Sequence, residues 1–329
     1  MLTHPPEVRL ESVPCPLGCP PDNELVVTGR DRLHDLPGTF SVVRCRGCGL
    51  LRTDPRPTVG TIGFYYPEAY APHQPVAVLT GRGNGELGRL AHRARVRLGD
   101  TRATSVPPTA PGRLLEVGCG AGGFLQAMAA RGWDVAGLEL SARAAARARN
   151  LGYPVHEGVV ASFPPPAEPF DLVVAWMVLE HLHDPVGDLA RLRSWTRPDG
   201  WLALSVPDAS SLEFRLFRDR WFALQLPNHL WHFTPATLAR LLERGGWEVR
   251  RVRHQRTLVN LAVSSSYVLR DRDRAPVWAD RLARFRTDPG SARYALFPLA
   301  WALAALGQTG RMTVWARWAV AGGRLGARR

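Results

Sequence analysis

The sequence predicts an α/β fold in which a mostly parallel, seven-stranded sheet carries helices on both faces, preceded by a small cysteine-containing module. Two observations support this prediction. From residue 113 onward, short apolar and β-branched runs alternate with helical segments, which is typical of a parallel sheet built from βαβ units. Before that point, four of the five cysteines fall within the first 48 residues as two closely spaced pairs.

The cysteine pairs are CPLGC (Cys15, Cys19) and CRGC (Cys45, Cys48), separated by the strand-like stretches ELVVTG and TFSVVRC. Thiolates in paired knuckles are typical ligands of tetrahedral Zn²⁺. The first pair has three intervening residues where two are commoner, and four unrelated reduced cysteines are the alternative. Because nothing nearby supplies an open coordination position, we expect a structural zinc in a zinc-ribbon-like module over residues 1–60.

The segment that follows, residues 61–110, is rich in proline, glycine and aromatic residues and contains one helical stretch, ELGRLAHRARVRL (86–98). We expect a connector and a helical cover there. The sheet itself is predicted over 111–258, with strands at 113–117, 134–140, 154–160, 170–176, 200–207 and 247–255. Helices are predicted between the strands, two of them capped by Ser141 and Thr234, and the fifth strand is entered through an Asp199–Gly200 turn.

Beyond these strands, residues 259–309 predict a helical excursion, and the stretch RMTVWARWA within 310–329 has the strand character needed to return to the sheet before a basic tail. The longest apolar run, 294–307, is interrupted by Pro298 and is shorter than the ~20 residues that span a bilayer. We therefore expect a helix packed on the core, with peripheral contact to a membrane surface beside the arginine-rich tail as the alternative.

The stretch RLLEVGCGAGGFL (113–125) fits two cofactor fingerprints. Read from Gly118 it is G-x-G-x-x-G, and Glu139 follows about a helix and a strand later, as a dinucleotide-binding fold requires. Read from Glu116 it is E-x-G-x-G-x-G, which closes on Gly122. Both patterns let the backbone approach a ligand at the start of a helix, so the glycines alone do not choose between them.

A later segment favours the second interpretation. The stretch FDLVVAWMVLEHLHDP followed by RPDGWLALSVPD resembles the class I S-adenosylmethionine (SAM) methyltransferases, whose motif I also resembles E-x-G-x-G-x-G. The resemblance covers roughly residues 110–255. The cysteine pairs, the CGL segment and the YYP…Y segment resemble a bacterial group of these enzymes that modifies sugars, polysaccharides and other small molecules, some of them similar to ubiquinone-pathway O-methyltransferases.

The resemblance implies a Rossmann-like methyltransferase fold with SAM bound at the carboxyl ends of the strands, and with Glu139 placed to accept two ribose hydroxyls. The third strand ends in GVVAS, without the acidic residue many relatives carry, so adenine recognition is expected from backbone and apolar groups near Val160 and Ala161. An aromatic face favours a cation, which makes Tyr66 and Tyr70 candidates to wall the sulfonium, with packing of the connector as the alternative. The expected cofactor-binding residues are Glu116, Gly118, Cys119, Gly120, Gly122, Glu139, Leu140, Val160, Ala161, Trp176, Met177, His181 and Tyr66.

If the methyl acceptor is a hydroxyl, a general base assists, and histidine suits neutral pH. The candidate bases are His229, His181 and His232. The loop 208–233, which follows the fifth strand and contains His229 and His232, is expected to roof the acceptor, with aromatic surfaces for a polar ring and arginines for phosphate or carboxylate. This predicts a small hydroxylated acceptor such as a sugar or nucleotide sugar. The alternative is a surface helix with its aromatic side chains packed inward.

Two other functions stay open at this stage, namely a zinc-module rRNA or tRNA methyltransferase and a non-catalytic SAM-binding or interaction module. The formal net charge of +13 would suit nucleic acid, but all 42 basic residues are arginine, which indicates compositional bias. We therefore expect a small-molecule partner and do not expect nucleic acid, although the arginine excess leaves it open. No charged stretch followed by an apolar one opens the chain, which favours the cytoplasm. The acceptor's identity, the choice among O-, N- and C-methylation, and the oligomeric state are not predicted.

Overall fold

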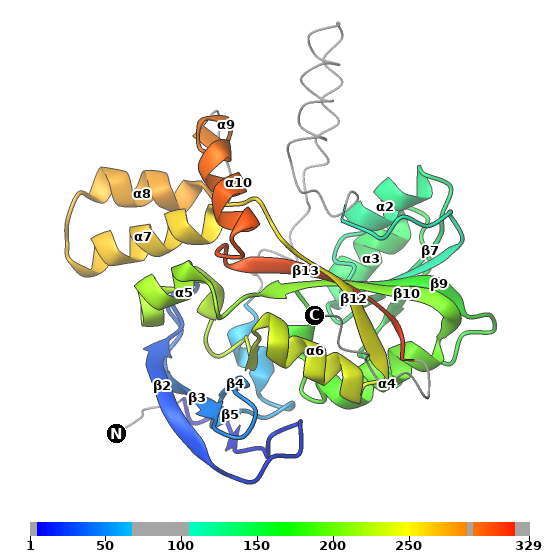
Figure 1. Cartoon of the computed structure of the whole chain (residues 1–329), viewed down its shortest axis with the longest axis horizontal. Helices are drawn as coiled ribbons and strands as arrows, with labels where there is room; N and C mark the ends of the chain where they lie inside the picture. The colour runs from blue at the N-terminus through cyan, green and yellow to red at the C-terminus, as the bar shows by residue number, and fades with distance from the viewer. Residues whose placement is uncertain (1–4, 68–104, 288–291, 320–329) are drawn as a thin grey trace, which may run out of the picture.

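A computed structural model of the chain describes residues 5–67, 105–287 and 292–319 (Figure 1). The predicted cover helix at 86–98 and Tyr70 lie outside the described residues. The described chain forms a large sheet with helices on both faces, a smaller antiparallel sheet built mainly from the N-terminal residues, and a group of helices to one side.

The large sheet has seven strands in the order β12-β13-β10-β9-β6-β7-β8. The strands β6, β7, β8, β9 and β10 run parallel to one another, whereas β13 runs antiparallel to both β10 and β12. The mostly parallel seven-stranded sheet and the returning strand are therefore confirmed. The strands are β6 (Arg113–Val117), β7 (Asp134–Glu139), β8 (Val155–Glu157), β9 (Phe170–Trp176), β10 (Thr196–Pro207), β12 (Trp247–His254) and β13 (Arg311–Trp318).

Two strands differ from the prediction by more than one residue at an end. β8 ends at Glu157 because Gly158 adopts a φ of +150° and a 3₁₀ turn, η4 (Val160–Ser162), follows at once. β10 begins at Thr196, before the predicted Asp199–Gly200 turn, and its pairing with β9 shifts register between Thr196 and Trp201. The predicted turn is wrong, because an irregularity of the β-bulge type takes up the extra residues within the strand.

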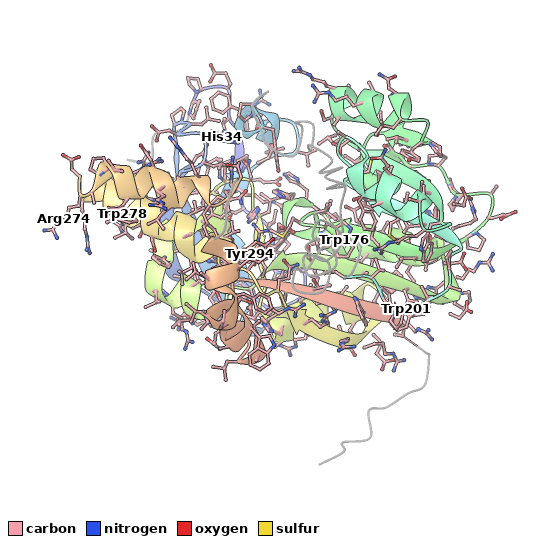
Figure 2. All side chains as sticks on the ribbon, turned by 90° about the horizontal axis from the view of Figure 1, so that it is seen from above. His34, Trp176, Trp201, Arg274, Trp278 and Tyr294 are labelled. Carbon is pink, nitrogen blue, oxygen red and sulfur yellow. The ribbon has the colours of Figure 1, made fainter. Side chains whose placement is uncertain are left out.

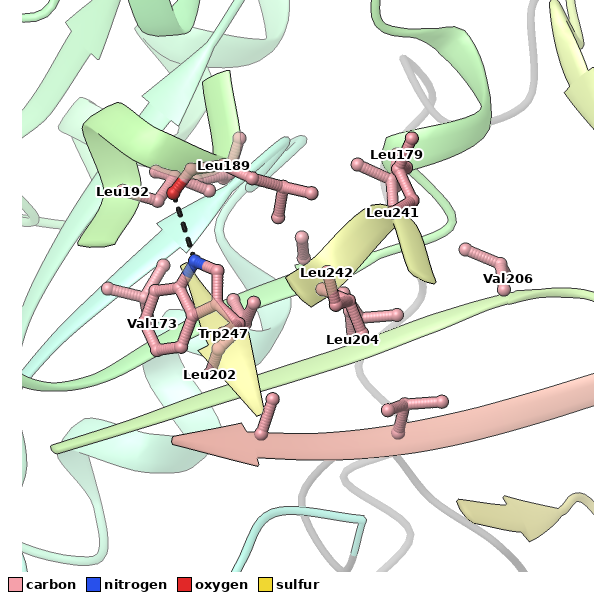
Figure 3. Close-up of a cluster of buried hydrophobic side chains, with 14 of the residues drawn as sticks. Val173, Leu179, Leu189, Leu192, Leu202, Leu204, Val206, Leu241, Leu242 and Trp247 are labelled. Carbon is pink, nitrogen blue, oxygen red and sulfur yellow. Dashed lines mark hydrogen bonds between the residues drawn. The ribbon is translucent and has the colours of Figure 1, made fainter. Parts of the chain in front are cut away.

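Alternate side chains of the central strands enter two separate cores, as strand geometry requires. Val173 and Ala175 of β9 pack in one cluster with residues of α4 (Pro185–Ser194) and α6 (Pro235–Arg244), two helices that lie below the sheet in Figure 1. Figure 3 shows this cluster, in which the indole nitrogen of Trp247 donates to the backbone oxygen of Leu189 at 2.9 Å. Leu172, Val174 and Trp176 point the other way, toward α2 (Gly123–Ala129) and α3 (Ala142–Asn150).

The helix caps follow local sequence chemistry. The Ser141 hydroxyl accepts from the backbone N–H of Ala144 at the start of α3, and the Thr234 hydroxyl accepts from that of Thr237 at the start of α6. Both predicted caps are confirmed, because a hydroxyl at this position accepts from N–H groups that have no partner inside the helix.

The smaller sheet is antiparallel, in the order β11-β4-β3-β2, and a short β1–β5 pair stands beside it. Its unexpected member is β11, which comes from the loop between β10 and α6 and pairs with β4. The N-terminal module and the methyltransferase-like core therefore share one sheet. The strands are β1 (Leu10–Glu11), β2 (Asn23–Arg30), β3 (Thr39–Cys45), β4 (Leu51–Thr53), β5 (Arg56–Pro57) and β11 (Trp231–His232).

The predicted helical excursion is confirmed between β12 and β13, and its helices stand on the side of the molecule away from α2 and α3 (Figure 1). α7 contacts both α5 and α8. Within the described ranges, no helix combines the length and the apolarity that a membrane crossing requires. The helices of the excursion are α7 (Val259–Asp271), α8 (Pro276–Arg284), α9 (Ala292–Ala295) and α10 (Phe297–Ala305), whereas α5 (Leu212–Phe217) lies between β10 and β11.

Candidate functional site

The glycine loop after β6 adopts the geometry of the E-x-G-x-G-x-G pattern. Gly118, Gly120 and Gly122 have φ values of +70°, +54° and +84°, a region that side chains strongly disfavour. A Cβ on Gly118 would lie only 2.6 Å from Cγ2 of Val178. Gly123, the third glycine of the alternative pattern, is instead the first residue of α2. The backbone therefore requires glycine at the three positions of the second fingerprint.

Glu139 ends β7 beside this loop, and backbone groups hold its carboxylate. Its Oε2 accepts from the N–H of Gly120 at 2.8 Å, and its Oε1 accepts from the N–H of Ser141 at 2.9 Å. An ionised carboxylate has about four acceptor positions, so two of them stay available for hydroxyl groups. Glu116 lies one strand away, fully buried in β6. Both glutamates thus lie at the strand ends where the sequence placed them.

The other predicted cofactor residues occupy different environments. Leu140 and Ala161 are exposed, directly after β7 and within η4. Cys119, Val160 and Trp176 are buried, and the Trp176 ring meets Phe124 edge-on with 5.6 Å between centroids. The buried side chains pack in the core, so contact with a cofactor at these positions would use backbone atoms. Their assignment as cofactor residues stays a prediction.

Met177 follows β9 with a φ of +58°, and its N–H donates to the backbone oxygen of Ser205 at 2.9 Å. A non-glycine residue in this region is strained, and such strain often marks functional sites. The chain then enters the short turn η5 (Leu179–His181), which places Glu180 and His181 near the carboxyl ends of β9 and β10.

The structure brings two of the three candidate bases together. The rings of His181 and His229 meet edge-on with 4.7 Å between centroids. Ligand atoms of Glu180, His181 and His229 all lie within 4.8 Å of one another, so this group could hold a metal ion as well as move a proton. Glu180 was not predicted as a site residue, although the Leu-Glu-His segment that contains it supported the resemblance.

A hydrogen bond fixes which nitrogen of the His229 ring carries the proton. Nδ1 of His229 lies 2.8 Å from the backbone oxygen of Ala223, and Nδ1 of His181 lies 2.9 Å from that of Asn228. A carbonyl oxygen only accepts, so Nδ1 of His229 donates and its Nε2 keeps the lone pair. The Tyr66 hydroxyl also lies 2.9 Å from Nδ1 of His181, which places this predicted cofactor residue beside the histidine pair.

Burial sets the charge of this cluster. It lowers the pKa of His181 to about 4, and together with the neighbouring histidines it holds the pKa of His229 well below its usual range. Burial also raises the pKa of Glu180 to about 8, although the nearby Arg311 acts in the opposite direction. At neutral pH both imidazoles are therefore uncharged and can accept a proton.

These shifts predict how stability depends on pH. Between 4.5, the ordinary pKa of a glutamate, and about 8, folded Glu180 binds more protons than unfolded Glu180, so its contribution to the free energy of unfolding falls as pH rises. The buried histidines have the opposite effect on the free energy of unfolding, but only below pH 6.5. Below their ordinary pKa of 6.5 they bind protons in the unfolded chain but not in the folded one. The free energy of unfolding is therefore expected to fall between pH 6.5 and 8, by about 1.4 kcal/mol per pH unit for Glu180.

Chemical denaturation at several pH values checks this expectation. Glu180→Gln removes the titrating group and should flatten the decline above pH 6.5, the ordinary histidine pKa. The matched control is Glu24→Gln, whose side chain pairs with Arg44 at the surface and should leave the slope unchanged. Equal slopes for the wild type and Glu180→Gln would contradict the raised pKa.

His232, the third candidate base, lies in the sheet that joins the two parts of the chain. Its Nε2 lies 3.2 Å from the Thr53 hydroxyl, which itself donates to the backbone oxygen of His229 at 2.7 Å. Burial lowers the pKa of His232 to about 3. The ring does not belong to the group formed by Glu180, His181 and His229, so its predicted role as a base stays without geometric support.

The N-terminal module holds the loops that carry the histidines. The N–H of Thr53 donates to the backbone oxygen of Leu230 at 2.9 Å, and the Asn228 side chain donates to that of Tyr65 at 2.8 Å. Arg56 donates to the backbone oxygen of His183 at 3.2 Å, next to the turn that bears His181. No motif marked Thr53 or Asn228 in the sequence, because both act through partners far away along the chain.

The four predicted metal ligands meet in the module. Sγ atoms of Cys15, Cys19, Cys45 and Cys48 lie within 4.8 Å of one another, with 3.5 Å between those of Cys15 and Cys48. Zinc–sulfur bonds of about 2.3 Å in a tetrahedron give a sulfur–sulfur separation of about 3.8 Å, whereas a disulfide requires about 2.05 Å. The donor set therefore fits a tetrahedral thiolate-bound metal.

The predicted aromatic roof over the acceptor is wrong. Phe214 and Trp221 are only 3% and 1% exposed and pack in a hydrophobic cluster with Phe217 at its edge, and Trp231 is equally buried in β11. Arg215 and Arg218 are exposed on the outer side, where they bond to Gln308 and to the backbone of Val26. The alternative interpretation, aromatic side chains inward and arginines outward, is the one observed. The reason is the large apolar area that these rings bury.

A cavity of about 320 Å³ lies elsewhere, lined by Arg113, Asp134 and Phe170 among others. These residues begin β6, β7 and β9, so the cavity is at the amino ends of the strands. Ligands of open α/β sheets bind at the carboxyl ends, where Glu139 and His181 lie, and we do not assign this cavity to the cofactor.

Comparison with known proteins agrees with this geometry. The family described as "Methyltransferase domain" matches residues 90–252. The ubiquinone biosynthesis O-methyltransferase of Thiobacillus denitrificans is 33% identical over 171 residues, which cover 48% of this chain and 72% of that protein. Its namesake from Cereibacter sphaeroides is 29% identical over 173 residues, which cover 49% of this chain and 69% of that protein.

Among solved structures, a SAM-dependent methyltransferase from Mesorhizobium loti is 19% identical with a TM-score of 0.43, covering 65% of this chain and 95% of that one. A magnesium protoporphyrin IX methyltransferase from Synechocystis is 13% identical with a TM-score of 0.44, covering 74% and 91%. At these TM-scores the two structures add no further support. The matched family and the curated relatives, together with the glycine geometry, decide between the two cofactor fingerprints. The chain belongs to the SAM-dependent methyltransferases.

Proposed function

We propose that this enzyme methylates a hydroxyl group of a small molecule, with His229 as the general base. The observation that carries the proposal is the His181–His229 pair, two uncharged imidazoles near the carboxyl ends of the strands, of which His229 keeps its Nε2 lone pair. Two curated relatives named O-methyltransferases support oxygen as the acceptor atom. The main argument for a sugar acceptor no longer holds, because the aromatic side chains of the loop 208–233 are buried or half-buried and form no roof.

SAM, when bound, supplies a methyl group already activated by a sulfonium. The residues of this chain would mainly orient the cofactor and exclude water. We propose that backbone N–H groups of the glycine loop and the carboxylate of Glu139 hold it, and that Leu140 and Ala161 flank the adenine from their exposed positions. Tyr66 would stand at the methyl end, because its hydroxyl reaches His181.

His229 is the better candidate for the base. Its Nδ1–H is bound to the backbone oxygen of Ala223, which leaves Nε2 to accept a proton from a hydroxyl placed beside it. His181 makes two contacts through Nδ1, to Asn228 and Tyr66, and its ring packs against His229. We infer that His181 orients the base and lines the cofactor site. We also infer that His232 has a structural role in the sheet formed by β11, β4, β3 and β2.

We further propose that Cys15, Cys19, Cys45 and Cys48 hold a structural zinc. Four thiolates complete a tetrahedral site and leave no open position for substrate. Such an ion would cross-link the chain before β2 to the turn between β3 and β4, and β4 is the strand that pairs with β11.

Measuring the release of S-adenosylhomocysteine with a panel of acceptors tests the proposed reaction. The panel should contain phenols and catechols, sugars and nucleotide sugars, primary amines, and an RNA fragment at low and high salt. Turnover with a hydroxylated small molecule is the expected result. Turnover only with amines, or salt-sensitive methylation of the RNA, would overturn the proposal.

Glu139→Ala is expected to weaken SAM binding roughly 10- to 100-fold, because a charge-assisted hydrogen bond is worth about 1.5–3 kcal/mol. Calorimetry with SAM and, separately, with NAD measures the effect. Glu157→Ala at the end of β8 is a matched control, since that side chain pairs with Arg149 at the surface.

Glu139 also accepts two backbone N–H bonds, so a second variant separates cofactor contact from support of the loop. Glu139→Gln retains one oxygen acceptor and should lose less affinity than Glu139→Ala at an equal thermal midpoint. SAM affinity unchanged in both variants, or tight NAD binding without SAM binding, would contradict this cofactor site.

A further inference from the structure

The helical arm, which we define as residues 276–287 and 292–306, exposes an unusual share of apolar side chains. Fifteen large hydrophobic side chains are exposed in the described residues, and seven of them lie in this arm. The two exposed tryptophans are both here, with exposed fractions of 58% for Trp278 and 57% for Trp301. So large a share of exposed apolar side chains in one segment indicates a contact surface. The seven are Val277, Trp278, Tyr294, Leu296, Leu299, Trp301 and Leu306.

Helix α10 is apolar all round and mostly exposed. Of its nine residues only Ala300 is buried, while Phe297, Leu303 and Ala304 are half-buried and mark the face toward the protein. Leu299 and Trp301 are both exposed although they are two residues apart, about 200° around the helix axis. A flat protein partner would cover one stripe of such a helix. Exposure over so wide an arc instead favours an apolar medium that covers every side the protein leaves open.

The length of α10 limits how deeply the helix can enter such a medium. Nine residues extend about 13.5 Å, less than half of the ~30 Å hydrocarbon core of a bilayer. The helix can therefore lie in the interfacial region of a membrane but cannot cross it. Tryptophan and tyrosine are the side chains enriched at that depth, and the arm presents Trp278, Tyr294 and Trp301.

The charge of the arm and of the turn before it is predominantly positive. Residues 270–287 contain six arginines against three aspartates. One of the aspartates, Asp271, is already paired with Arg32 and Arg220. Figure 2 shows Arg274 and Trp278 projecting together from the end of the arm. Apolar and aromatic side chains bordered by arginines match a bilayer surface that carries anionic lipids.

We propose that this arm docks the enzyme on the surface of an anionic lipid bilayer, with Trp278 and Trp301 inserted at the level of the headgroups. A second copy of the chain fits less well, because a self-complementary contact would place one arginine-rich rim against another. The proposal does not depend on which acceptor is methylated.

Co-sedimentation of the full chain with phosphatidylcholine vesicles, with and without phosphatidylglycerol, tests the proposal. We expect binding only to the vesicles that contain phosphatidylglycerol, and release at high salt. The double variant Trp278→Ala/Trp301→Ala should lower the partition coefficient on the order of tenfold or more. Each of Arg274→Gln and Arg281→Gln should lower it roughly fivefold.

The double variant Leu25→Ala/Leu216→Ala is the matched control, since both leucines are exposed but lie outside the arm, in β2 and α5. Unchanged thermal midpoints and unchanged stabilisation by SAM establish that each variant is folded. Equal partitioning of the wild type and the tryptophan variant would overturn the proposal. So would light scattering that detects a dimer which the tryptophan variant abolishes and which vesicles do not disrupt.

Discussion

Replacing His229 by glutamine is expected to lower kcat about 10²- to 10⁴-fold, the usual contribution of a general base. The SAM dissociation constant should stay nearly unchanged, because His229 acts on the acceptor's proton and its ring is held by the backbone oxygen of Ala223. Single-turnover methylation of the best acceptor, together with calorimetry of SAM, measures the two quantities. A loss of kcat at constant SAM affinity is the signature of an interaction made only in the transition state.

Two further variants complete this experiment. His181→Gln should have a smaller effect on kcat and some effect on SAM affinity, because His181 contacts Tyr66 and lines the cofactor side. His156→Gln is the matched control, since that ring packs against Phe163 near the end of β8 and lies outside the cluster. Full turnover in both His229→Gln and His181→Gln would remove the base from the mechanism.

Cys45→Ser is expected to release the metal and to destabilise the N-terminal module strongly. Structural zinc contributes apparent free energies of about 10–16 kcal/mol in small zinc-binding domains at neutral pH. Cys45 is fully buried at the end of β3, so the module cannot keep its fold around an open site. Metal analysis, thiol titration and thermal unfolding measure the loss.

The same variant should lower turnover more than it lowers SAM affinity. β4 pairs with β11, and Thr53 bonds to the backbone of His229, so an unfolded module releases the base while the glycine loop keeps its own contacts. Cys119→Ala is the control for metal content, because that thiol lies outside the cluster. Freshly purified protein without zinc and with four freely titrating thiols in the folded state would count against the site.

Much of the fold follows from local sequence chemistry. Short apolar and β-branched runs predicted the strands, and the hydroxyls of Ser141 and Thr234 predicted two helix starts. These features depend on residues within a few positions of one another, so they can be recognised without the rest of the chain. The spacing of Cys45 and Cys48 belongs to the same class, because a metal knuckle is a local structure.

The candidate site depended on contacts between distant residues. The sequence contained two cofactor patterns that share Gly118 and Gly120, and they are separated only in the folded loop, where Gly122 has a φ of +84° and Gly123 already begins α2. His181 and His229 are 48 positions apart in the sequence, and they meet because η5 and the loop before β11 are held by the same N-terminal module.

The same reason explains the error over the loop 208–233. An aromatic residue beside an arginine fits either a binding roof or a helix packed on the core, and the sequence pattern is identical in both cases. Burial of Phe214 and Trp221 depends on whether a hydrophobic cluster lies beneath them. By itself the sequence determined the strands, the helix caps, and the kinds of side chain that form the candidate active site and the cysteine cluster. Only the tertiary structure decided which side chains face a ligand, because that depends on what the rest of the chain already covers.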